Sequence, residues 1–183
     1  MPIFIEHGFA GARVDEIAEQ VGVSKPVIYK IFDGKDELAA AVVEEAHRIE
    51  AGFHIEVGAV EAYEQIAEGR ITPLYEAAFP LAAEHRALSR FLYIPLRDAP
   101  PAAAEFHEEC FRMRTLGVEH YALQYFAGRE DAEERAHQFG RAASAIGRLG
   151  LAKVAAYDDL GEADALKLAR DYGKLLEQGV QGV

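Results

Sequence analysis

GARVDEIAEQVGVSKPVIYKIFDGKDEL, residues 11–38, is the stretch that decides the fold class of this 183-residue chain. Apolar side chains recur at steps of three and four residues on both sides of Gly22, which predicts short helices over residues 13–21 and 24–32. Ser24 stands at the expected N-cap of the second helix, and Pro26 stands in its first turn, where a missing N–H costs nothing. Two short helices joined by a tight turn predict a helix-turn-helix.

The two helices of a helix-turn-helix have different roles when the motif contacts DNA. A short helix is held in the major groove only when another helix crosses the backbone and packs against it through an apolar inner face. We assign that inner face to Ile17, Ala18, Val21, Val23, Ile28 and Phe32. The residues then left to point toward DNA or its edges are Ser24, Lys25, Pro26, Val27, Tyr29 and Lys30.

The same stretch resembles the tetracycline-repressor (TetR) family of transcriptional regulators. The matching positions are Gly8-Phe9, Ile17-Ala18, Gly22-Val23-Ser24, Tyr29, Phe32, Lys35 and Leu38. The resemblance implies that Tyr29 and Lys35 contact phosphates. Many members place threonine at the position of Ala12 as a phosphate contact, so the resemblance implies that Arg13 takes over this contact here. From residue 58 onward the resemblance rests only on length and helix pattern.

Charge is the weak point of this interpretation. The chain carries a net charge of −12, and residues 1–38 hold four lysine and arginine residues against seven carboxylates, a net −3. Such a balance argues against a general nucleic-acid coat but leaves room for a local contact. Because the family usually has a longer first helix before Gly8-Phe9, we expect further residues, some of them basic, upstream of Met1.

The whole chain predicts an all-α fold in two domains. Residues 1–46 form the N-terminal three-helix helix-turn-helix domain, with a truncated first helix, and residues 47–183 form a helical domain for ligand sensing and dimerisation. The stripe Leu38, Val42, Ala46, Ile49 and Phe53 predicts a long helix between the two. Further helices are expected over residues 60–69, from residue 72 through the apolar stretch 74–83, and over residues 87–94, 102–127, 130–157 and 162–178.

Apolar and aromatic residues of the second domain are candidates for lining a ligand pocket. Pro80 lies inside an apolar helical stretch, where a proline removes a backbone bond and predicts a kink. Since kinked helices often border cavities, we expect a small, largely apolar effector near it. The candidate lining residues are Phe79, Phe91, Tyr93, Phe106, Cys110, Phe111, Met113, His120 and Tyr121.

A row of small residues in the last two predicted helices suggests close helix–helix approach. Each glycine inside a helix costs about 1 kcal/mol relative to alanine, so a row of them needs a reason. A homodimer interface built as a four-helix bundle is one use, and packing within the subunit is the other. The candidate interface residues are Gly140, Ala143, Ser144, Gly147, Leu151, Leu166, Ala169, Tyr172, Gly173 and Leu176.

Enzymatic and metal-dependent functions lack support in the sequence. The chain has no nucleophile elbow, phosphate loop or H-E-x-x-H motif, and no cofactor is expected. His107 and Cys110 share a helix face, but two ligands do not make a metal site. No apolar run is long enough for a membrane span, so a cytoplasmic protein without membrane contact is expected.

The sequence therefore predicts a ligand-responsive transcriptional repressor that is not an enzyme. A homodimer would bind double-stranded palindromic operator DNA through helix Ser24–Phe32 and would be released by the effector. Two alternatives stay open. One is a constitutive DNA-binding regulator without an effector, and the other is a helical small-molecule-binding protein whose helix-turn-helix does not function.

Overall fold

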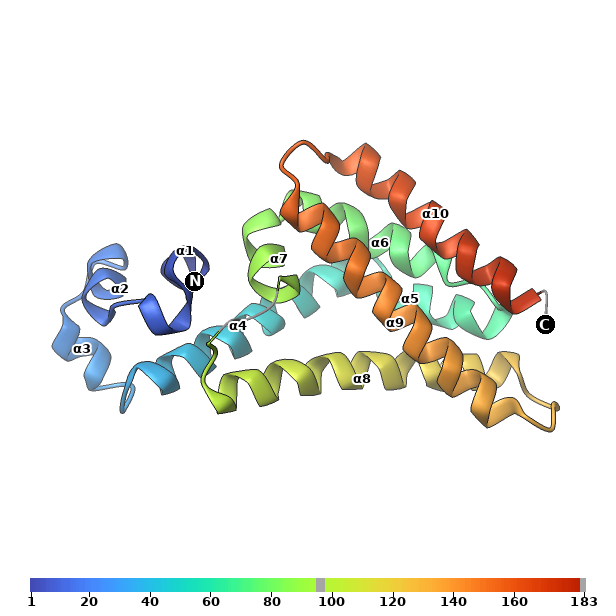
Figure 1. The fold of residues 1–183 in the computed structure, drawn as a ribbon, viewed down its shortest axis with the longest axis horizontal. Coiled ribbons are helices and arrows are strands. Elements are labelled where there is room, and N and C mark those ends of the chain that lie inside the picture. The colour runs from blue at the N-terminus through green and yellow to red at the C-terminus, as the bar shows by residue number, and fades with distance from the viewer. Residues whose placement is uncertain (95–97, 182–183) are drawn as a thin grey trace.

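The computed structural model describes residues 1–94 and 98–181, and these residues are helical without any strand, which confirms the all-α fold class. Three helices form one end of an elongated molecule (Figure 1). The long helix α4 leads from that end into the remaining helices. The N-terminal elements are α1 (Pro2–Gly11), α2 (Val14–Gln20), α3 (Lys25–Tyr29) and α4 (Lys35–Glu56).

Helix α1 bends sharply at Gly8. The backbone there has φ 68° and ψ 175°, a combination that only glycine adopts without strain. The bend turns Phe9 back toward Phe4, with their rings stacked 4.9 Å apart, and sets Phe9 5.9 Å from the ring of Phe91. Phe91 belongs to the larger helical part, so the bend at Gly8 connects the two parts of the molecule.

Replacing Gly8 by alanine should therefore lower the free energy of unfolding by about 1–3 kcal/mol, because alanine must adopt a glycine-only conformation. Space is not the cause, since a Cβ at Gly8 would meet nothing within 4 Å. Urea denaturation measures the effect. Gly11→Ala is the matched control: its Cβ would make an ordinary 3.5 Å contact with His7, so that variant should be no less stable than the parent. Equal losses in both variants would contradict the assigned backbone conformation.

The helix-turn-helix has a small core of its own. Val14, Ala18, Ile28 and Leu38 are buried together, with Ile17 and Phe32 packed partly against them. Two predictions for this region are wrong. The side chains of Val21 and Val23, expected inside, are 61% and 40% exposed.

The second helix of the motif is also shorter than predicted. The expected helix over residues 24–32 is realised as α3 over residues 25–29. Ser24 occupies the N-cap with extended backbone, but its side chain makes no capping hydrogen bond. The recognition element is therefore a short helix held mainly by the packing of Ile28.

Helix α4 spans 22 residues, about 33 Å at 1.5 Å per residue. Its buried face differs from the predicted stripe, because Ile49 is exposed and a charged residue, Glu50, is buried. The buried residues are Leu38, Ala39, Val43, Ala46, His47 and Glu50. The buried face of α4 is thus rotated around the helix axis relative to the expected stripe. Toward the C-terminal end of the helix, this face becomes polar.

Seven further elements build the larger part of the molecule. They are α5 (Ala59–Glu64), η1 (Gln65–Glu68), α6 (Thr72–Glu84), α7 (Arg86–Tyr93), α8 (Pro101–Tyr125), α9 (Ala132–Ala156) and α10 (Glu162–Gln181). Helix α6 continues through Pro80, and the chain leaves helical geometry instead at His85, with φ −103° and ψ 46°. Within the described ranges, every helix is too short or too polar to cross a bilayer.

The small residues of α9 and α10 pack inside the subunit. A Cβ on Gly147 would lie 3.1 Å from the ring of Tyr75, and one on Gly173 would lie 2.6 Å from the Cα of Thr72. Of the ten candidate interface residues, six are buried and four half-buried in the single chain: Gly140, Ala143, Gly147, Leu151, Ala169 and Gly173, and Ser144, Leu166, Tyr172 and Leu176. The six buried residues of this face are therefore used for packing within the subunit.

Candidate functional site

The surface of the helix-turn-helix presents the predicted DNA-facing residues to solvent. Ile28 is the one buried residue of α3, and it faces the small core. Lys35 is half-buried at the first position of α4. The exposed candidates are Arg13, Ser24, Lys25, Pro26, Val27, Tyr29 and Lys30. The structure thus brings these side chains onto one accessible element and its flanks.

The four basic residues of this surface differ in what they contact. Lys25 pairs with Asp15 of α2 at 3.1 Å, with both side chains about half exposed. The Lys35 ammonium donates to the carbonyl oxygens of Ala10 and Ala12 at 2.8 and 3.3 Å, which ties α4 to the end of α1. Within the described residues, Arg13 and Lys30 form no ion pair. These two cations are therefore the ones free to meet phosphates.

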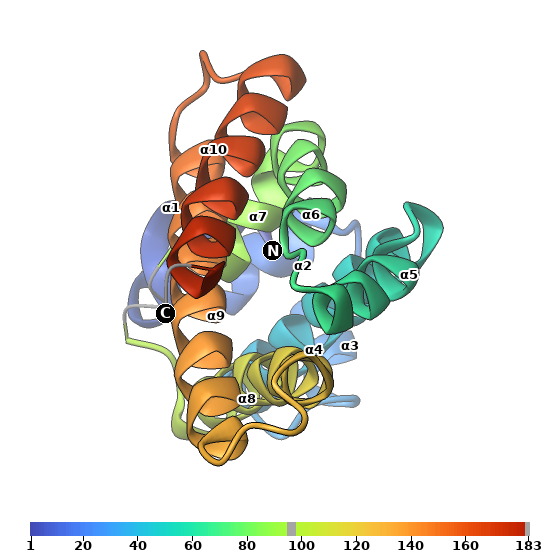
Figure 2. The ribbon, with the colours of Figure 1, turned by 90° about the vertical axis from the view of Figure 1, so that its right-hand side faces the viewer.

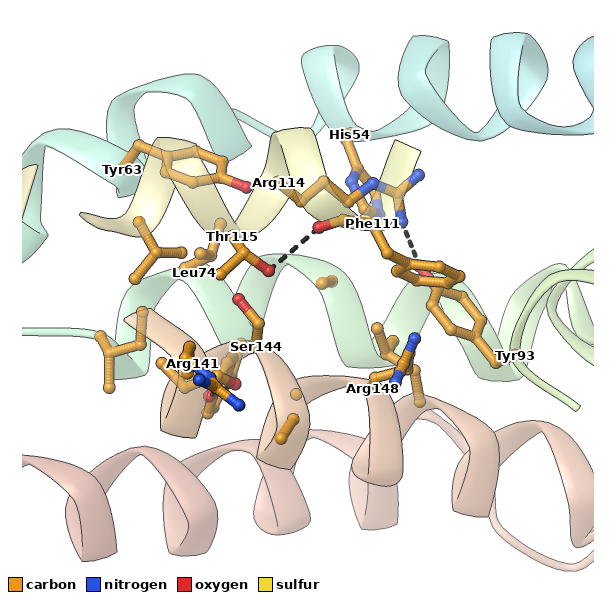
Figure 3. Close-up of a pocket in the computed structure, with 18 of the residues that line it drawn as sticks. His54, Tyr63, Leu74, Tyr93, Phe111, Arg114, Thr115, Arg141, Ser144 and Arg148 are labelled. Atoms are coloured by element: carbon orange, nitrogen blue, oxygen red, sulfur yellow. Dashed lines mark hydrogen bonds between the residues drawn. The ribbon is translucent and has the colours of Figure 1, made fainter. Parts of the chain in front are cut away.

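A cavity of about 380 Å³ lies in the larger part of the molecule (Figure 3). Its volume falls in the range of small-molecule sites. The inner wall is chiefly apolar and aromatic and comes from α4, α5, α6, α7, α8 and α9. It consists of His54, Tyr63, Ile71, Leu74, Tyr75, Ala78, Phe79, Tyr93, Phe111, Val118, Ala143, Gly147 and Leu151.

The predicted pocket residues divide between the lining and other places. Phe79, Tyr93 and Phe111 line the cavity. Phe91 is buried against Phe9, and the remaining predicted residues lie outside the lining: Phe106, Cys110, Met113, His120 and Tyr121. Phe106 and Met113 are 38% and 56% exposed, because the face of α8 that enters the cavity is the one carrying Phe111, Thr115 and Val118.

A buried polar cluster forms the wall between α4, α7 and α8. The Arg114 guanidinium donates to both carboxylate oxygens of Glu50, one of them at 3.3 Å, and to the Tyr93 hydroxyl at 3.0 Å. The Tyr93 hydroxyl in turn donates to Glu50. Arg114 also lies 3.3 Å from Nδ1 of His47, whose Nε2 is 3.0 Å from Nδ1 of His107. The Arg114–Glu50 ion pair and its neighbours therefore join three helices beside the cavity, and Figure 3 shows the hydrogen bond between Arg114 and Tyr93.

The charges of this cluster are stabilised by each other. Burial alone would raise the pKa of Glu50, but hydrogen bonding to His47 and the charge of Arg114 outweigh it and lower the pKa to about 2. Burial, helped by His47 and Arg114, lowers the pKa of His107 to about 4. At neutral pH the cluster thus contains a carboxylate and a guanidinium beside a neutral His107.

Arginines also gather on the exposed side of the cavity. Arg141, Ala145 and Arg148 of α9 face Glu108 and Arg112 of α8 across its mouth. The Arg148 guanidinium lies 4.8 Å from the centre of the Phe111 ring. This mouth is positively charged in a chain whose net charge is −12.

The sequence interpretation missed most of these polar residues. Glu50, His54, Arg114, Arg141 and Arg148 were not among the candidates, because charged residues in helices usually face solvent. Glu50 carries one usable signal: it follows Ala39, Val43 and Ala46 at helical steps of four, three and four on a buried face. A carboxylate in such a position indicates a buried partner. The described residues contain no cluster of three or more metal-ligand side chains.

Comparison with known proteins agrees with the N-terminal geometry. Residues 1–42 match the sequence model for bacterial regulatory proteins of the tetR family. The HTH-type transcriptional activator FasR of Mycolicibacterium smegmatis is 48% identical over 42 residues, which are 23% of this chain and 19% of FasR. An HTH-type transcriptional repressor of Streptomyces coelicolor is 46% identical over 41 residues, 22% of this chain and 21% of the repressor. The matched stretches thus span about a fifth of these relatives.

The larger part of the molecule has a structural counterpart. The fatty acid degradation regulator FadR of Bacillus halodurans superposes with a TM-score of 0.64 over 97% of this chain and 94% of its own, at 18% identity. That likeness shows a shared fold across both parts of the chain. The motif spacing, the exposed α3 and the match over residues 1–42 together show that the N-terminal domain is a helix-turn-helix of the tetR type found in bacterial regulatory proteins.

Proposed function

We propose that this protein is a dimeric transcriptional repressor that binds a palindromic operator and is released by a small, largely apolar effector. Residues 1–46 act as the DNA-binding domain, and residues 47–183 as the sensing and dimerisation domain. In the dimer, two copies of α3 enter successive major grooves, about one helical turn or 34 Å apart. The exposure of seven of the eight candidate contacts supports this docking.

The path of α4 is the single observation that carries the proposal of effector control. Its first residue, Lys35, holds the end of α1 within the DNA-binding part. Its C-terminal half contributes His54 to the cavity wall and Glu50 to the buried cluster beside it. A ligand acts only through its different affinity for two states, and one that shifts this wall would move a helix continuous with the DNA-binding part. This favours effector control over a constitutive regulator.

Dimerisation is assigned to the outer face of α9 and α10, which lie together on one flank of the molecule (Figure 2). Ala142, Leu149, Ala152 and Ala156 of α9 follow each other at steps of seven, three and four. Leu149 and Leu175 of α10 are each 63% exposed. Ala142 and Ala156 are also exposed, whereas Ala152 is half-buried against the core. A stripe of small and apolar residues allows close approach of two helix pairs across a two-fold axis.

Operator binding by two α3 variants tests the DNA-binding part of the proposal. Lys30→Gln should weaken all DNA sequences alike and lower the salt dependence by about one phosphate contact, because Lys30 supplies charge. Val27→Ala should instead change the preference at particular bases, because an apolar side chain reads thymine methyl groups. Fluorescence anisotropy with operator and randomised duplexes at several salt concentrations measures both effects.

Asp158→Asn is the control for charge changes far from the DNA-binding part, since Asp158 pairs with Arg90 of α7. It should leave both the affinity and the salt dependence as in the parent. If Lys30→Gln and Val27→Ala also behaved as the parent does, the docking of α3 proposed here would be incorrect.

A further inference from the structure

The mouth of the cavity differs from its interior in charge. The interior offers a ligand no free charge, because Arg114 is committed to Glu50 and Tyr93 and burial lowers the pKa of His54, which leaves that imidazole neutral. The Tyr75 hydroxyl is also engaged, since it donates to the carbonyl oxygen of Ala143. Burial raises the pKa of Tyr75, so this hydroxyl stays neutral. The body of a bound molecule would therefore meet mainly the apolar side chains Ile71, Leu74, Phe79, Val118 and Leu151.

Two arginines of α9 lie at the mouth, and few carboxylates lie close enough to neutralise their charge. Arg141 forms no ion pair or hydrogen bond with the described residues. Arg148 has one acidic neighbour, Glu108, at a loose 3.9 Å, and its guanidinium lies over the Phe111 ring. The third rim arginine, Arg112, is different, because it is paired with Glu109 through two hydrogen bonds. Arg141 and Arg148 are therefore the available cations.

The two arginines lie on the same side of the mouth with a hydroxyl between them. They are two helical turns apart on α9, and Ser144 lies between them, opposite Thr115 of α8 (Figure 3). Thr115 already donates to the carbonyl oxygen of Phe111, whereas the Ser144 hydroxyl has no partner among the described residues. Guanidinium groups and a hydroxyl donor around one space are the chemistry that binds a carboxylate, sulfonate or phosphate.

We propose that the effector is an amphipathic anion, whose apolar body fills the cavity and whose anionic group binds Arg141, Arg148 and Ser144 at the mouth. This inference rests on the proposed function, since it names the chemical class of the effector. A cationic molecule would be repelled at the mouth. An uncharged molecule would gain only the apolar contacts of the interior.

A pair of fluorescent probes with one body and two charges tests this assignment. 1-Anilinonaphthalene-8-sulfonate carries a sulfonate, and N-phenyl-1-naphthylamine is the same aromatic framework without it. The full chain should bind the sulfonate probe more tightly, at one molecule per chain, and only that binding should weaken as salt is raised. Arg141→Gln and Arg148→Gln should each weaken the sulfonate probe by about tenfold, the loss of one charge-assisted contact, and leave the uncharged probe unchanged.

Two further variants make the result specific to this cavity. Arg129→Gln removes the same charge from an exposed position outside the lining and should leave both probes unaffected. Val118→Phe fills the interior and should abolish binding of both probes. Equal affinities for the two probes, unchanged by Arg141→Gln and Arg148→Gln, would overturn the anion assignment and leave effector binding in place. Absence of binding by either probe to the parent would overturn both the assignment and the cavity as an effector site.

Discussion

Arg114→Met is expected to lower the free energy of unfolding by about 3–5 kcal/mol, the largest loss of stability that we predict for a single residue. The variant keeps the length of the side chain but removes the guanidinium, which leaves the Glu50 carboxylate buried without its counter-charge. The Glu50 side chain is only 7% exposed, so water cannot replace the lost partner. Urea denaturation at pH 7, followed by circular dichroism, measures the difference.

The pH dependence of this loss has a definite sign. The pKa of Glu50 falls from an ordinary 4.5 to about 2 in the folded chain, which corresponds to about 3 kcal/mol. The parent has this contribution fully above pH 4.5 and loses it as the pH falls toward 2. In Arg114→Met, the pKa of Glu50 should rise above that in the parent, because the charge and the hydrogen bond of Arg114 are lost while burial stays. Protonation then relieves the penalty at a higher pH, so the difference in stability between variant and parent should become smaller as the pH is lowered.

The double variant Glu50→Gln with Arg114→Met provides the control. It removes both charges, so it should be more stable than Arg114→Met alone at pH 7. A double variant that is less stable by the full sum of the two single losses would show that the two residues act independently. That result would contradict the ion pair assigned to this wall.

Leu149→Glu is expected to convert the proposed dimer into a monomer and to lower operator affinity by at least about 100-fold, because two linked half-site contacts become one. Leu149 is 63% exposed in the single chain, so the change should cost little stability within the subunit. Light scattering after gel filtration measures the mass, and fluorescence anisotropy with a two-half-site duplex measures the affinity.

Gly150→Ala is the matched control on the adjacent residue of α9. Its added Cβ would overlap the ring of Phe79 inside the subunit, so overpacking should cost about 1–3 kcal/mol of stability. The mass should nevertheless stay that of the dimer. A dimeric Leu149→Glu together with a monomeric Gly150→Ala would place the interface on the glycine face and contradict the assignment made here.

The helix-turn-helix could be predicted from sequence because its determinants are local. Gly22, with φ 73°, marks the turn, and the apolar spacing around it places Ala18 and Ile28 in a shared core. The limits of α3 could not be predicted, because the chain leaves the helix at Lys30 without a glycine or proline to mark its end. Local patterns thus specify the elements of the motif better than their ends.

The cavity was predictable only in part, because its walls come from helices distant in sequence. Phe79 and Tyr93 were identified as aromatic residues in apolar stripes, and both line it. Arg114 was missed, because its partner Glu50 lies 64 residues away and no local sequence pattern links the two. The glycines of α9 correctly indicated close packing, but their neighbours lie within the subunit: Tyr75 and Phe79 of α6 at Gly147 and Gly150, and Glu119 of α8 at Gly140. Spacing shows that a face is close-packed and does not identify the partner.

DNase footprinting of the full chain on the DNA flanking its own gene tests operator binding. At low salt we expect a protected palindrome with two half-sites about one helical turn apart. Protection should be weaker in Lys30→Gln and absent in Leu149→Glu at the same concentration. A folded, dimeric parent protein that protects no site on that DNA would contradict the assignment of this chain as an operator-binding regulator.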